Sequence, residues 1–144
     1  MNDINIFKEF SEIDLINDHI IELINLSLKD AKYSETKINL IFCNNKTLNK
    51  FKNDFFDDDV LTDIVTFPII NNDILEAEIY ISVEMAKSNS KKFNVTLNNE
   101  LCRLIIHGIL HLLGYEDNTD DKKDMMFKKQ EDIISNFSKD ICFE

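Results

Sequence analysis

The sequence predicts an α+β domain in which a small mixed four-stranded sheet is covered by helices. The first observation behind this prediction is the order of the elements: strand, helix, strand, helix, two strands and then three helices. The second is a segment over residues 97–113 that is apolar nearly all round, which indicates a helix buried at the centre of the fold. Because 144 residues suffice for one domain with a real core, we expect residues 1–144 to form a single unit.

Strands and helices alternate in the first half of the chain. Residues 3–9 alternate weakly in polarity and are predicted as an edge strand, whereas residues 37–44 alternate with period two and are predicted as a strand. Residues 45–52 are predicted as a short helix, and the three carboxylates at 57–59 as a solvated turn. A helix is expected over residues 14–33, because apolar residues recur there at three- and four-residue steps: Ile16, Ile20, Leu23, Ile24, Leu28 and Ala31.

The second half is predicted to hold two more strands and the remaining helices. Residues 63–67 and 78–82 are rich in strand-forming residues. The segment 69–75 between them is expected to be a connector, because two asparagines and an aspartate lie at its tip. Helices are predicted over residues 83–93 and 120–137, on either side of the central helix.

Residues 97–117 have the most unusual composition of the chain. Two of its three histidines lie here, and so do its only two glycines, Gly108 and Gly114. Thr96 is the predicted N-cap of the central helix, and Glu100 lies near the positive end of the helix dipole. The helix is expected to end at Gly114, because glycine adopts the left-handed conformation without steric cost.

Three side chains of this segment have the spacing of a metal site. His107 and His111 are four residues apart, so a helix places both imidazoles on one face, with Cβ atoms about 5–6 Å apart. The turn at Gly114 then returns Asp117 toward them. Two imidazoles, a carboxylate and an open fourth position suit one tetrahedral zinc ion, and such an open position is typical of catalytic zinc. The alternative is a pair of histidines satisfied by ordinary hydrogen bonds.

Composition excludes several classes of protein. With 44% hydrophobic and 30% charged residues the chain has globular composition, and no stretch approaches the roughly eighteen apolar residues of a membrane helix. The first residues show neither a secretory signal nor a transit peptide, so a cytoplasmic location is expected. Cys43, Cys102 and Cys142 are odd in number and widely spaced, which indicates reduced structural thiols.

Three stretches carry a family resemblance. Residues 107–117, His-Gly-Ile-Leu-His-Leu-Leu-Gly-Tyr-Glu-Asp, resemble the signature His-Gly-x-Leu-His-Leu-x-Gly-Tyr-Asp-His of the YbeY family, bacterial metal-dependent endoribonucleases implicated in ribosomal RNA maturation. Residues 62–68, Thr-Asp-Ile-Val-Thr-Phe-Pro, are similar to that family's Thr-Asp-Val-Leu-Ser-Phe-Pro. Residues 77–82, Ala-Glu-Ile-Tyr-Ile-Ser, are similar to its Gly-Asp-Ile-x-Ile-Ser. The resemblance spans roughly residues 37–135.

The resemblance implies a zincin-like fold with a metal-bearing central helix and one zinc ion per chain. It implies a metal-dependent single-strand endoribonuclease that acts in 3′-end maturation of small-subunit ribosomal RNA and in ribosome quality control. The implied partners are ribosomal RNA, or the small ribosomal subunit and its proteins, with no DNA and no membrane. In this sequence Asp117 stands where the family more commonly has a third histidine, and Phe56 stands where it usually has an arginine.

The charge balance restricts how the chain meets RNA. With 16 basic and 27 acidic residues the net charge is −11, which disfavours tight nonspecific binding to a polyanion. Any RNA contact must therefore be local, and Lys52, Lys87 and Lys91 are the candidates for binding the substrate. Arg103 lies one helical turn before His107 and is the candidate for the catalytic role of the missing arginine.

Two other functions remain open at this point. A zincin-like metalloprotease is favoured by the histidine spacing but opposed by Gly108, which stands where proteases of the His-Glu-x-x-His type carry their general base. A catalytically weak, ribosome-associated metal-binding module is favoured by Phe56 and by the negative charge.

Overall fold

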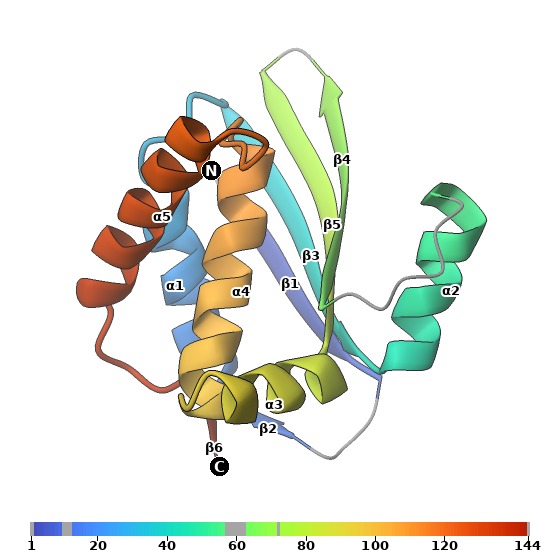
Figure 1. Ribbon diagram of the computed structural model, residues 1–144. Helices are drawn as coiled ribbons and strands as arrows, with labels where there is room; N and C mark the ends of the chain where they lie inside the picture. Colours follow the sequence, from blue (N-terminus) through green and yellow to red (C-terminus); the bar gives the residue numbers. More distant parts are fainter. Residues whose placement is uncertain (1, 10–12, 57–62, 72, 144) are drawn as a thin grey trace.

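The computed structural model describes most of the chain (Figure 1). It covers residues 2–9, 13–56, 63–71 and 73–143, and for residues 51–56 and 70 it describes the backbone alone. The turn predicted at residues 57–59 lies outside the described part, and so do the side chains of Lys52 and Phe56.

A mixed sheet with the strand order β1-β3-β5-β4 forms the frame of the fold. Three of its strands, β1 (Asn2–Lys8), β3 (Glu35–Cys43) and β5 (Ile74–Ser82), run parallel to one another. The fourth, β4 (Ile64–Asn71), is an edge strand antiparallel to β5. The predicted α+β class, the mixed four-stranded sheet and the edge position of the first strand are therefore confirmed.

Helices cover one face of this sheet (Figure 1). α1 (Asn17–Ser27) and α4 (Leu97–Leu112) pack on that face, and α5 (Asp120–Ser135) packs against α4. α3 (Val83–Lys92) lies at the N-terminal end of α4, whereas α2 (Asn45–Phe56) contacts β4 and β5. The strand side chains buried beneath the helices are Ile38, Leu40, Phe42, Leu75, Ala77, Ile79 and Ile81.

The opposite face of the sheet is covered only in part. α2 packs there through Leu48 against Cys43 and Val65, which form a small second core. Farther along the strands Lys37 and Glu76 are exposed. Among the described residues, no helix has the length and apolar content that crossing a bilayer requires.

The predicted helix over residues 14–33 is wrong at both ends. Residues Asp14–Leu15 form the short strand β2, which pairs antiparallel with β6 (Cys142–Phe143), so α1 begins only after them. α1 also ends earlier than predicted, but Leu28 and Ala31 still contact the core. Most of the apolar stripe therefore faces the core, although Leu28 and Ala31 lie beyond the end of the helix.

The connector predicted over residues 69–75 is also wrong. β4 continues to Asn71 and β5 begins at Ile74, so most of that segment is paired strand. Pro68 lies inside β4, where a missing backbone donor is tolerated because β4 is an edge strand. Cross-strand pairing thus outweighs the turn-forming residues nearby.

Gly108 lets α4 lie close to the sheet. A Cβ atom at this position would stand 2.8 Å from Ile64 Cδ1 and 3.6 Å from both Ile79 Cγ2 and Thr66 Cγ2. The helix is otherwise lined with buried apolar side chains, in agreement with the prediction of a central buried helix. This close approach places the middle of α4 directly over β4 and β5.

Candidate metal centre

α4 holds two imidazoles one turn apart. Its N-cap is Thr96, as predicted, whose side-chain oxygen accepts a hydrogen bond from the backbone N–H of Asn99 at 3.0 Å. His107 and His111 follow on one face, with ring centroids 4.5 Å apart and ring planes at 84°. Both side chains are about one-third exposed, at 32% and 34%. The imidazoles are therefore accessible from the surface while their helix is fixed in the core.

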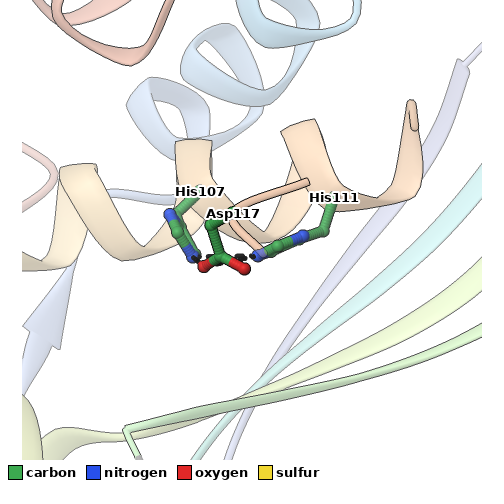
Figure 2. Close-up of side chains that lie close together, drawn as sticks. All are labelled: His107, His111 and Asp117. Carbon is green, nitrogen blue, oxygen red and sulfur yellow. Dashed lines mark hydrogen bonds and ion pairs between the residues drawn. The ribbon is translucent and has the colours of Figure 1, made fainter. Parts of the chain in front are cut away.

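Figure 2 shows both imidazoles and the carboxylate of Asp117 turned toward one another. The two Nε2 atoms lie 3.0 Å apart. Asp117 Oδ2 lies 3.9 Å from His107 Nε2 and 3.7 Å from His111 Nε2. For comparison, two nitrogen ligands at zinc distances of about 2.0–2.1 Å in a tetrahedron stand roughly 3.3 Å apart. The three donor atoms thus converge to separations close to those around a zinc-sized ion, with the two nitrogens slightly closer together and the carboxylate oxygen slightly farther away.

The other nitrogen of each imidazole is engaged by the protein. His111 Nδ1 lies 3.1 Å from the carbonyl oxygen of Tyr115, and His107 Nδ1 lies 3.3 Å from Gln130 Oε1. Both partners are acceptors, which favours the tautomer with the proton on Nδ1 and leaves Nε2 of each ring to face the other donors. Burial, and next the neighbouring His111, lower the pKa of His107, which favours its neutral form. Two facing lone pairs and a carboxylate are a donor set that a cation satisfies.

A glycine turn brings Asp117 to this position. Gly114 has a φ of 99°, in the left-handed region that the sequence predicts for it. The N–H of Tyr115 donates to the carbonyl of Leu110 at 3.0 Å, and that of Gly114 to the carbonyl of His111 at 3.1 Å. These two bonds form a Schellman motif, which ends α4 and reverses the chain. The position of Asp117, the third donor, therefore follows from a turn that local backbone hydrogen bonds form.

We expect Gly114→Ala to destabilise the protein by about 1–2 kcal/mol, because an L-residue with a side chain is strained in the left-handed region. Space is not the cause, since nothing lies within 4 Å of the point where a Cβ atom would stand. Urea unfolding measures the loss, and Gly114→Asn should lose less, since asparagine tolerates this conformation better. Equal stability of the alanine variant and the parent would contradict the assignment of a left-handed conformation to residue 114.

The centre is open on the side of Asp117, whose side chain is 49% exposed. A small cavity of about 180 Å³ adjoins it, lined by His107, Asp117, Lys123, Met126, Phe127 and Gln130. Space for a further ligand therefore remains beside Asp117 and His107.

Arg103 lies near the centre but is paired. Its NH1 donates to the carboxylate of Glu131, and its Nε donates to Asn99 Oδ1 at 2.8 Å. Together with His107 it also lines a second cavity, which is larger, at about 440 Å³. A phosphate that contacts Arg103 there must compete with Glu131.

The predicted substrate lysines are not brought to the three donor atoms. Lys87 and Lys91 lie on α3, half-buried and exposed respectively, and line neither cavity at His107. Lys52 lies on α2, and its side chain is outside the described part. A different lysine, Lys123, lines the small cavity at Asp117.

Two features of the site escaped sequence analysis. The first is Gln130, the partner of His107; the available signal was its place on α5, four residues after the buried Met126. The second is the meeting of Asp63 and Glu100 in the larger cavity, where Glu100 is buried. Nothing local in the sequence links the start of β4 with the start of α4.

Position 108 bears on the protease alternative. A glutamate there would extend from a point 2.8 Å from Ile64 Cδ1, between α4 and the sheet. A general base must instead reach the substrate side of the metal. The geometry of α4 therefore does not favour a protease of the His-Glu-x-x-His type.

The matching family model and the sequence relatives reported below share one name. A family model described as "Endoribonuclease YbeY" matches residues 3–138. A protein of that name from Cytophaga hutchinsonii is 38% identical over 115 residues, which cover 78% of this chain and 79% of the relative. Another, from Flavobacterium johnsoniae, is 33% identical over 132 residues, 91% of this chain and 95% of the relative. The solution structure of TM1509 from Thermotoga maritima matches with a TM-score of 0.65 and 27% identity, over 93% of this chain and 88% of that one.

Proposed function

The chain belongs to the YbeY endoribonuclease family, and we propose that it is a hydrolase that cleaves single-stranded RNA with the help of one divalent ion, zinc. The proposed ligands are His107, His111 and Asp117. The supporting observation is the convergence of two Nε2 atoms 3.0 Å apart and a carboxylate oxygen within 3.9 Å of both, while both Nδ1 atoms are engaged elsewhere.

Each residue of the centre has a proposed task. When bound, the ion acts as a Lewis acid on a phosphoryl oxygen and lowers the pKa of its water. The Tyr115 carbonyl and Gln130 hold the two rings so that Nε2 of each is free for the metal. Arg103 is proposed to release Glu131 when the substrate binds, and then to stabilise the charge on the phosphate. Lys52, Lys87 and Lys91 are proposed to contact the substrate farther from the centre.

The proposed setting is ribosomal RNA processing in the cytoplasm, with residues 1–144 acting as a single YbeY-like domain. We propose that the protein acts there in 3′-end maturation of small-subunit ribosomal RNA and in ribosome quality control. A net charge of −11 weakens free binding to RNA, so we propose that the small ribosomal subunit and its proteins help to position the substrate. Neither DNA nor a membrane is part of the proposal.

The zinc-loaded protein is expected to cleave single-stranded RNA slowly and to leave casein intact. EDTA should abolish the cleavage and added zinc should restore it, because the bound ion supplies the Lewis acid. Gel electrophoresis of both substrates over matched times measures this. Faster cleavage of casein than of RNA would replace the proposal by a protease. Inertness toward both would favour a metal-binding module that associates with the ribosome.

A further inference from the structure

A larger cavity of about 440 Å³ lies beside His107, between the start of β4, the end of α3, and the helices α4 and α5. It is lined by Asp63, Ile64, Phe93, Val95, Glu100, Arg103, Leu104, His107, Phe127 and Gln130. Its volume lies in the range of small-molecule sites, roughly 300–1,000 Å³. It shares His107, Phe127 and Gln130 with the small cavity at Asp117, so a group bound in it lies next to the metal centre.

Besides Arg103, His107 and Gln130, the polar lining of this cavity includes two carboxyl groups that share one amide. Asn89 Nδ2 donates to Asp63 Oδ2 at 3.1 Å, and Asn89 is also hydrogen-bonded to Glu100. Glu100 is only 7% exposed, and burial, followed by the charge of Asp63, raises the pKa of its carboxyl group. A ligand that donates hydrogen bonds relieves this unfavourable charge, whereas an anionic group does not.

The remaining wall is apolar and partly aromatic. Phe93 and Phe127 are each 58% exposed, which is a high value for so large an apolar side chain. Leu104 and Val95 extend the apolar surface between them. Lys92 Nζ lies 5.6 Å from the centre of the Phe93 ring, so a cation stands at this edge of the cavity. Exposed aromatic rings next to basic side chains are the usual platform for unstacked bases of single strands.

We propose that this cavity binds one base of the RNA strand beside the bond that is cut, and that it prefers guanine. The inference rests on the proposed function, since it names the part of the substrate that this same site selects. Guanine is favoured because its Watson–Crick edge carries two adjacent N–H donors, which one carboxylate accepts together. Uracil offers one donor between two acceptors, and adenine and cytosine offer one amino group beside an acceptor nitrogen.

The test uses zinc-loaded protein and four fluorescein-labelled oligouridine strands that differ in one central base. Fluorescence anisotropy at 4 °C measures binding within minutes, and electrophoresis checks that the strands are intact. The parent should bind the strand with guanine about tenfold more tightly than the strand with uracil. Asp63→Asn and Glu100→Gln each replace an acceptor pair by an amide of the same shape. At least one of them should reduce this ratio to below about twofold, and that variant identifies the carboxylate that accepts the guanine edge.

Matched controls separate the cavity from general effects. Phe127→Ala should weaken binding of all four strands, because it removes a stacking surface. Phe7→Ala removes an aromatic ring that is 52% exposed on β1 and should leave binding unchanged. Glu76→Gln removes a carboxylate from the open face of the sheet and should keep the preference for guanine. Thermal unfolding verifies that each variant is folded.

The outcomes distinguish this inference from the proposed function. Equal binding of the four strands, or no measurable binding of any, overturns the inference, and so does a preference that survives in both Asp63→Asn and Glu100→Gln. Cleavage of all four strands at one rate supports the hydrolase and overturns the guanine site. A preference for guanine in binding, with no cleavage of any strand, supports the site and overturns the hydrolase.

Discussion

His111→Ala is expected to release the metal ion and to reduce RNA cleavage roughly a thousandfold, since a metal supplies several kcal/mol of transition-state stabilisation. The reason is geometric: His111 Nε2 is one of three donors and lies 3.0 Å from His107 Nε2, so its loss leaves one imidazole and one carboxylate. Elemental analysis should find about one zinc per parent chain and almost none in the variant. Timed cleavage of single-stranded RNA measures the activity.

The third histidine provides a matched control. His19 lies on α1, where its Nδ1 is 2.6 Å from the carbonyl oxygen of Asp140, and it belongs to no group of metal donors in the described part of the chain. His19→Ala should keep both zinc and activity. Zinc should also raise the melting temperature of the parent and of His19→Ala, but not that of His111→Ala. Full zinc occupancy in both His107→Ala and His111→Ala would rule out this centre.

Asp117→Ala is expected to weaken zinc binding by at least about a hundredfold, because even loss of a group that only supports a ligand costs 10–100-fold. Asp117→His should keep the ion, since imidazole is an equally competent zinc ligand. The carboxylate is the harder donor, so the parent should accept Mn²⁺ more readily than Asp117→His does. Competition titrations with a chromophoric chelator measure both affinities.

The competing account makes Asp117 a cap for the last helix. Thr119 fills that position instead: its side-chain oxygen accepts a hydrogen bond from the N–H of Lys122 at 3.2 Å. Thr119→Ala should therefore cost about 1 kcal/mol of stability without loss of zinc. Asp117→Ala should instead lose zinc affinity while its stability without zinc stays close to that of the parent. Unchanged zinc affinity in Asp117→Ala would assign the third ligand to another residue.

The sequence predicts the central helix and its ends well because these features are local. The Thr96 cap, the burial of the helix and the turn at Gly114 each depend on residues within one or two turns of one another. The common face of His107 and His111 follows from helical spacing in the same way. Asp117 is only three residues beyond the turn, so the short segment after Gly114 already restricts where its carboxylate can lie.

The sequence predicts strand and helix limits less well where distant segments pair. Asp14–Leu15 looks like the first turn of a helix, but it pairs with Cys142–Phe143 at the other end of the chain. The turn-forming residues near position 72 suggest a long connector, yet β4 and β5 pair almost to the tip. In both places hydrogen bonds to a remote strand outweigh the local preference of the backbone.

The candidate metal ligands can be identified from the amino-acid sequence alone, since their chemistry and spacing belong to one helix and the turn that follows it. Their surroundings depend instead on tertiary packing. Gln130 supports His107, Glu131 engages Arg103, and Asn89 joins Asp63 to Glu100, and each contact links separate elements. These partners depend on how α3, α4, α5 and β4 pack together. Packing is driven by burial of apolar surface, which has no direction of its own, so a sequence shows which faces are buried but not which elements meet.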